Sequence, residues 1–193
     1  MATTHEHIDG RLRAFIEAQP MFFTATAPLS GDGHVNLSPK GRVGTLVVID
    51  EHTLAYLDFG GSGAETIAHV RENGRITLMW CSFSGAPNIV RVHGEGEAVF
   101  RDDPRWGELI ALFGDADGPS ARAVIVVRTR RITDVCGYAV PFMEYQGERT
   151  LHAEYFGRKS DEEFAEYCAK KEFIGTSLDG LPALPLPLPA RTV

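Results

Sequence analysis

Residues 53–74 read TLAYLDFGGSGAETIAHVRENG and contain three local patterns in succession. The first pattern, Thr53–Phe59, is rich in β-branched and aromatic residues and predicts a strand. Gly60–Gly63 then interrupts it. A helix is predicted from about Ala64 to Glu72, because Asn73-Gly74 is a typical stop signal. The segment therefore predicts a strand that leads through a glycine-rich loop into the start of a helix.

That loop has two interpretations on its residues alone. Glycines at 60, 61 and 63 let the backbone approach a ligand closely, and a helix start favours phosphate. Ser62 and Thr66 add hydroxyl donors to such a site. Ser62 and Glu65, however, also have the spacing of a capping box. The chemistry of these residues alone fits a plain helix cap after a tight turn better than a phosphate site.

Further strands are predicted on both sides of this segment. They lie at Met21–Ala27, His34–Ser38, Thr45–Ile49, Arg75–Cys81, Ile89–Phe100 and Ala121–Cys136. Interior glycines at 94 and 96 predict a bulge or sharp bend in the long strand that contains them. Short turns join several of these strands, so the sheet should be largely antiparallel. We expect a mainly β (α+β) protein, an antiparallel split β-barrel of about seven strands.

Helices are predicted at the margins of this barrel. Their expected positions are residues 5–19, Asp103 to about Phe113 with Asp103 as cap, and Ser160 to about Lys171 with a Ser160–Glu163 capping box. Residues 181–193 include four prolines and predict an extended tail without helix. We therefore expect a single domain over residues 1–180, followed by a Pro-rich tail over 181–193.

Composition narrows the possible function classes. The chain has 193 residues and a net charge of −7, so bulk charge does not favour binding to nucleic acid or an anionic membrane. Its three cysteines, at 81, 136 and 168, lack the close spacing of a zinc site, and no metal is expected. The polar residues 1–10 predict no signal peptide. We expect a cytoplasmic protein.

Several segments, taken in order, resemble the pyridoxamine 5′-phosphate oxidase-like FMN-binding split-barrel family. The resemblance covers roughly residues 10–135, and the order and spacing of its motifs carry it. The matching segments are Phe22–Thr26, Asp32–Gly41, Tyr56–Asp58, Gly61–Thr66, Asn73–Leu78 and Val90–Gly96.

The resemblance implies a homodimer whose two subunits form two flavin sites, and a flavin-dependent oxidoreductase that uses FMN on an unknown small-molecule substrate. The cofactor-binding residues that it implies are Ser38, Lys40, Ser62, Gly63, Thr66 and Arg91. Typical members carry basic residues just after the serine that corresponds to Ser62. Here Gly63 and Ala64 stand in those places, so the positive charge opposite the phosphate is expected from Lys40, Arg42 or Arg91, with Lys40 preferred.

Alternatives to FMN stay open. Deazaflavin is one variant, and haem is another because some haem-binding proteins share this architecture. His93 and His152 are the histidines considered as ligands, although a structural or solvated role is the simpler interpretation of each. His69 is expected on a helix surface or at an interface. No nucleophile and base are placed together, so no catalytic residue is predicted; a flavin itself performs the redox chemistry.

Overall fold

The computed structural model describes residues 2–61, 63–116, 118, 120–170 and 172–189. Its centre is an eight-stranded sheet in the order β3-β2-β6-β7-β8-β5-β4, with β1 paired to β8. Every strand pairing is antiparallel. The strands are β1 (Ala2–His5), β2 (Met21–Thr26), β3 (Asn36–Gly41), β4 (Leu46–Asp50), β5 (Thr53–Phe59), β6 (Arg75–Cys81), β7 (Ile89–Val99) and β8 (Ala121–Val135).

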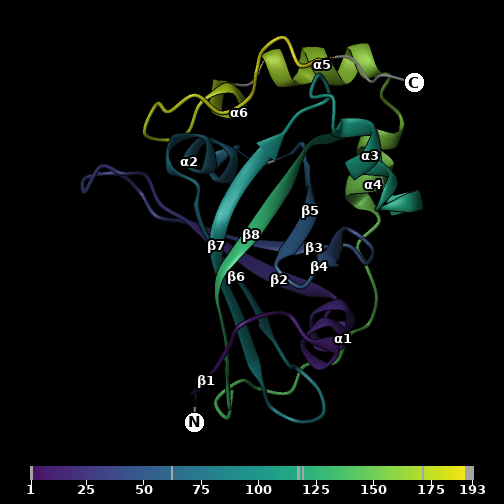
Figure 1. Ribbon diagram of the computed structural model, residues 1–193. Coiled ribbons are helices and arrows are strands. Elements are labelled where there is room, and N and C mark those ends of the chain that lie inside the picture. Colours follow the sequence, from purple (N-terminus) through teal and green to yellow (C-terminus); the bar gives the residue numbers. More distant parts are fainter. Residues whose placement is uncertain (1, 62, 117, 119, 171, 190–193) are drawn as a thin grey trace.

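The sheet curls into a split barrel with helices at its margins (Figure 1). The expected α+β split-barrel class is thereby confirmed. The helices are α1 (Gly10–Ala18), α2 (Glu65–Asn73), α3 (Trp106–Ala111), the 3₁₀ turn η1 (Gly114–Ala116), α4 (Leu151–Gly157), α5 (Asp161–Ala169) and α6 (Glu172–Gly175). In Figure 1, α5 and α6 lie at one end of the barrel, and α1 lies toward the other.

The predicted bend in the long strand is present in β7. The register between β7 and β8 shifts between His93 and Gly94. A side chain at position 94 would place its Cβ 2.4 Å from the backbone oxygen of Arg128, a distance that no real Cβ tolerates. Gly94 is therefore required for the close approach of the two strands at the bulge.

Both faces of β5 are buried, which explains its nearly continuous apolar sequence. Leu54 and Tyr56 face the main core inside the barrel. Ala55 and Leu57 alternate with them and face a second cluster beneath Trp106 of α3. Strand residues point alternately to opposite faces, so one strand joins the two clusters. This double packing fixes the end of β5, from which the glycine-rich loop departs.

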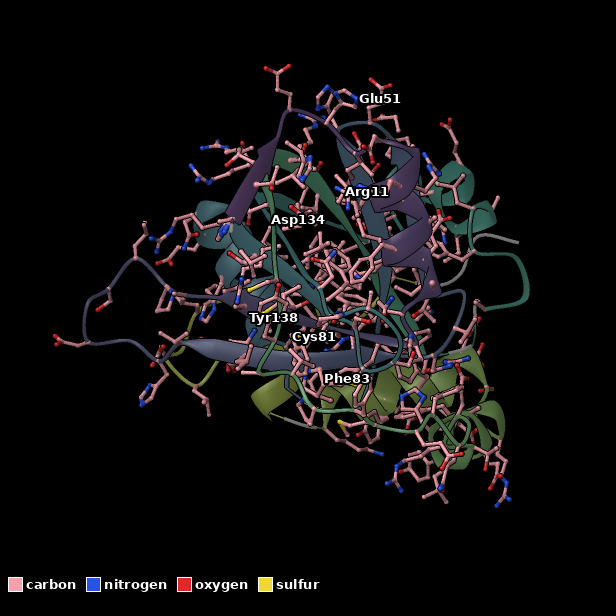
Figure 2. The ribbon with its side chains drawn as sticks, turned by 90° about the horizontal axis from the view of Figure 1, so that it is seen from below. Arg11, Glu51, Cys81, Phe83, Asp134 and Tyr138 are labelled. Carbon is pink, nitrogen blue, oxygen red and sulfur yellow. The ribbon has the colours of Figure 1, made fainter. Side chains whose placement is uncertain are left out.

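The N-terminus differs from the prediction of one helix over residues 5–19. Residues 2–5 instead form β1, and α1 begins at Gly10, where the carboxylate of Asp9 accepts the backbone N–H of Leu12 at 2.7 Å. Figure 2 shows this end of the molecule, where Arg11 of α1 donates to Asp134 of β8 at 3.2 Å. Pairing with β8 provides backbone partners that an isolated sequence pattern does not reveal.

The predicted helix starts at about Ala64 and at Ser160 are confirmed, whereas the start at Asp103 and the capping box of Ser62 with Glu65 are not. Helix α2 begins at Glu65 with Ala64 as its cap residue, so Glu65 stands too early to complete a capping box with Ser62. Helix α3 begins at Trp106 rather than Asp103, whose carboxylate accepts the backbone N–H of Arg105 in the preceding turn. The capping box of Ser160 and Glu163 is formed as predicted.

The Pro-rich segment is extended and lies against the core. Residues 181–189 contain no helix, as predicted, and an isolated bridge joins Thr176 to Pro182. Ala183, Leu184 and Leu188 are buried in the main hydrophobic cluster. The described part of the tail therefore packs with residues 1–180. Within the described residues, no helix is both long and apolar enough to cross a membrane.

Candidate functional site

A small cavity of about 150 Å³ lies between β3, the end of β5 and the start of α2. It is lined by Asn36, Ser38, Lys40, Asp58 and residues 63–66. Asn36, Ser38 and Lys40 share one face of β3, because alternate residues of a strand point the same way. The strand runs to Gly41, beyond the predicted end at Ser38, and the Lys40 side chain near its end is 21% exposed. The cavity is thus positioned by regular secondary structure on two sides.

A chain of hydrogen bonds crosses the floor of this cavity. The Asn36 amide donates to the hydroxyls of Thr26 and Thr66, both at 3.0 Å, while Ser38 donates to the Asn36 carbonyl at 2.8 Å. The Ser38 hydrogen is therefore already engaged. Thr66 receives a hydrogen, and among the described residues no acceptor takes its own. Thr66 is consequently the hydroxyl that is free to donate to a ligand.

The charged floor of the cavity is a buried carboxylate held by two cations. Asp58 is only 1% exposed, and its oxygens contact Lys40 Nζ at 3.1 Å and Arg122 Nε at 2.6 Å. Burial by itself raises the pKa of Asp58, but Arg122 and Lys40 outweigh burial and hold that pKa below its usual value. Lys40 and Arg122 thus place two cations at Asp58, while Glu65 is a second carboxylate in the cavity lining.

Arg122 also holds the glycine-rich loop. Its guanidinium donates to the backbone oxygen of Gly63 at 3.0 Å, and the side chain is 1% exposed. The loop is thereby tied to β8, the strand that carries Arg122. The first turn of α2 follows immediately, and the N–H groups of a helix start attract anions. The loop, the helix start and the two cations at Asp58 together make the cavity suited to a phosphate-sized anion.

Glu65 is a carboxylate that lines the cavity, and its oxygens contact residues outside the lining. One of its carboxylate oxygens accepts the backbone N–H of Leu178 at 2.9 Å. The other lies 3.9 Å from Nε2 of His69, a fully buried side chain. The carboxylate is therefore engaged with the C-terminal segment. His69 lies on the buried face of α2, where its Nδ1 is 3.0 Å from the Thr26 hydroxyl of β2, and not on the helix surface or at an interface as its helical position indicated.

A second, larger cavity of about 490 Å³ adjoins the first, and Lys40 lines both. Its walls come from the ends of β2, β3 and β5 and from a segment beyond the barrel. Among its lining residues are Met21, Arg42, Leu57, Phe59, Tyr145, Glu148, Arg149 and His152. A volume of this size, with mostly apolar walls and a few polar groups, is typical of small-molecule sites.

His152 closes one side of the larger cavity. Its Nε2 lies 2.7 Å from the backbone oxygen of Gly60, and its ring packs against Phe59 and Phe156. A Cβ at Gly60 would lie 2.5 Å from the ring of Phe164 in α5. Gly60 is therefore required for packing against the C-terminal helices, which gives this glycine a structural role in the loop.

The structure brings together four of the six predicted cofactor-binding residues. Ser38, Lys40, Gly63 and Thr66 all line the small cavity. Ser62 lies outside the described residues. Arg91 is on β7, opposite Met79 of β6 and Thr133 of β8, and does not line either cavity. The assignment of these residues to a cofactor stays a prediction.

Sequence reasoning missed three residues that organise the site. Asn36 and Asp58 stand in the segments that carry the family resemblance, but their roles require knowing that β3 and β5 both border the start of α2. Arg122 had a clearer signal, since it interrupts the apolar run 121–127 of a strand. A charge within a buried strand needs a partner, which points to a buried carboxylate. Across the described residues, no group of three or more His, Cys, Asp or Glu is placed to hold a metal ion.

Comparisons with known proteins agree with this architecture. The family model described as pyridoxamine 5′-phosphate oxidase matches residues 8–136. The pyridoxamine 5′-phosphate oxidase family protein ustO of Aspergillus flavus is 34% identical over 196 residues, covering 95% of this chain and 78% of its own length. Among solved structures, HupZ of Group A Streptococcus is 18% identical, covers 71% of this chain and 99% of its own, and has a TM-score of 0.54. The H111A variant of the same protein is 19% identical, covers 66% of this chain and 99% of its own, and has a TM-score of 0.54. These structural likenesses concern the fold alone.

Proposed function

Because the chain belongs to the pyridoxamine 5′-phosphate oxidase family, we propose that it binds FMN and acts as a flavin-dependent oxidoreductase. The observation that carries this proposal is the small cavity at the start of α2. It combines a free hydroxyl on Thr66, a helix N-terminus and the cations Lys40 and Arg122, which both contact Asp58. These are the groups that recognise phosphate.

The two adjoining cavities would each bind a different part of FMN. The small cavity would hold the phosphate, and the larger one, with its apolar walls, would hold the ring system. Lys40 stands between them. A bound flavin supplies the redox chemistry, while the protein binds it, orients it and excludes water.

The proposal is tested by titrating the protein with FMN and following the flavin absorbance. Lys40→Gln should weaken FMN binding about ten-fold or more, because a charged hydrogen bond contributes roughly 1.5–3 kcal/mol. Lys170→Gln is the matched control, since Lys170 is an exposed lysine of the C-terminal region that pairs with Glu166. An FMN spectrum that does not change on addition of the protein would contradict the proposal.

Deazaflavin and haemin are the comparison ligands in the same titration. His93 hydrogen-bonds Thr77 on the sheet, away from both cavities. His152 lines the larger cavity, but its Nε2 bonds Gly60 and its Nδ1 is buried. Neither histidine presents an open nitrogen to an iron in this cavity. An intense haem band that disappears in His152→Ala, without any flavin binding, would replace the proposal with the haem alternative.

We also propose a homodimer in a reducing, cytoplasmic environment. Val35 and Leu37, at 75% and 66% exposure, lie at the edge strand β3, and Tyr138, labelled in Figure 2, is 82% exposed. Exposed apolar side chains of this kind mark interaction surfaces. The three cysteines are free thiols. Light scattering across a dilution series tests the dimer, and a monomer of 21.1 kDa at every concentration would contradict it.

A further inference from the structure

Arg42 adopts a backbone conformation that arginine normally avoids. Its φ is +75°, and among the described residues every other positive φ belongs to glycine. The turn is held by Thr45, whose backbone N–H and hydroxyl both donate to the Arg42 carbonyl, at 3.2 and 2.6 Å. A side chain with a Cβ is strained there, whereas glycine is not. Such strain often marks a side chain retained for function.

The strained turn places a cation at the larger cavity. The Arg42 guanidinium lies 4.5 Å from the ring centroid of Phe59, and both residues line that cavity. Arg149 lines the same cavity. The side chain of neither arginine makes a hydrogen bond or ion pair with any described residue. In a chain of net charge −7, two arginines without carboxylate partners on one cavity point to an anionic ligand.

Three other polar side chains of the cavity are already engaged. One carboxylate oxygen of Glu148 accepts the backbone N–H of Val43, and no ion pair joins Glu148 to Arg42 among the described residues. Lys40 contacts Asp58, and Nε2 of His152 contacts the Gly60 carbonyl. Among the described lining residues, the two guanidinium groups are the cations that contact no carboxylate. Their planar forks match the geometry of a carboxylate.

We propose that Arg42, assisted by Arg149, binds the carboxylate of a flat aromatic acid, and that this is the substrate class of the larger cavity. The aromatic part of such an acid would lie among the apolar walls, beside Phe59 and Tyr145. The inference rests on the proposed function, because it takes this cavity as the place where substrate meets flavin. The proposed role of Arg42 is to bind the substrate carboxylate and thereby to select acids over uncharged aromatic compounds.

The test uses benzoate as the probe and benzamide as its uncharged match, with dissociation constants measured by ligand-observed NMR. The wild-type protein should bind benzoate roughly ten-fold more tightly than benzamide, as a charge-assisted contact implies. In Arg42→Gly that preference should disappear, and in Arg149→Ala it should decrease. Arg158→Ala, which removes an exposed arginine at the end of α4 outside the cavity lining, should keep it.

Arg42→Gly has a second readout, because glycine suits the positive φ. Its melting temperature should equal or exceed that of the wild-type protein while benzoate selectivity is lost. A lower melting temperature together with unchanged selectivity would show that Arg42 serves the fold, and would overturn the proposal. Equal binding of benzoate and benzamide to the wild-type protein would overturn it as well.

The measurements are made on flavin-free and on FMN-saturated protein, so that the two proposals fail separately. Benzoate selectivity that depends on Arg42 in a protein that never binds FMN would support the anion site and remove the flavin. FMN binding without Arg42-dependent selectivity, in either the flavin-free or the FMN-saturated protein, would support the flavin site and overturn the anion site.

Discussion

The two cavities share Lys40 but are built in different ways. The small cavity is formed by residues of β3, β5 and α2, all inside the region that matches the family model, and most of its polar groups are hydrogen-bonded to one another. The larger cavity takes its outer wall from residues 145–152, beyond that region, and leaves two arginines unpaired. We expect the small cavity, the inner one of the two, to bind the phosphate of the cofactor. We expect residues 145–152, the outer wall of the larger cavity, to determine which substrate binds.

The largest expected effect comes from breaking the charged floor of the inner cavity. Arg122→Met leaves the buried Asp58 carboxylate with Lys40 alone, and removal of one partner of a buried ion pair costs about 3–5 kcal/mol. Urea unfolding measures the loss. The double variant Arg122→Met/Asp58→Leu should recover much of it, because no carboxylate is then left buried. A single variant as stable as the wild-type protein would show that the floor does not support the fold.

A second variant measures how much the packing of the Pro-rich tail contributes to the stability of the fold. Leu184 is 5% exposed in the main core, near the point where Arg71 of α2 donates to the Ala183 carbonyl. Leu184→Ala should lower the free energy of unfolding by about 2–5 kcal/mol. Leu186→Ala, at a position that is 42% exposed, should cost much less. Equal losses in urea unfolding would contradict the packing of the tail against α2.

The hydroxyls of the inner cavity give a finer comparison. Thr66→Val keeps the shape of the side chain but removes the free donor, and should weaken FMN binding roughly ten-fold. Ser38→Ala should weaken it less than about two-fold, because the Ser38 hydrogen is already donated to Asn36. Calorimetric titration of both variants checks the order. The reverse order would place the phosphate beside β3 instead of α2.

The smallest expected effect is a pH dependence near the inner cavity. His34 and Asp179 are 2.7 Å apart, and the contact raises the pKa of His34 and lowers that of Asp179. The stabilisation is therefore complete below the unfolded histidine pKa and is lost as the pH rises through the higher folded value. The melting-temperature difference between the wild-type protein and His34→Ala should shrink from pH 6 to pH 9. A difference that grows over that range would contradict the pairing.

The strands that were predictable share a strong local signal. Thr53–Phe59 and Arg75–Cys81 occur in the structure with the predicted bounds, because apolar and β-branched residues follow a clear pattern between turn signals. Strand β1 and helix α4 were not predicted. The polar sequence of β1 becomes a strand only because β8 extends far enough to pair with it. Tertiary pairing of this kind leaves no local signal.

The site divides in the same way. Ser38, Lys40, Gly63 and Thr66 are predicted together because the family resemblance implies it, and the structure places all four in one cavity lining. The approach of Arg122 to Asp58 joins residues 64 positions apart, and that of His152 to Gly60 joins residues 92 apart. Such contacts depend on how β8 and α4 are placed in three dimensions, which the pattern of neither segment specifies.

The most direct test of the account compares FMN with riboflavin, which lacks the phosphate, by calorimetric titration of flavin-free protein. If the inner cavity holds the phosphate, FMN should bind at least about ten-fold more tightly than riboflavin, and Thr66→Val should reduce that ratio. Equal affinities of the wild-type protein for FMN and riboflavin would contradict the assignment of the cavity at the start of α2 to the phosphate.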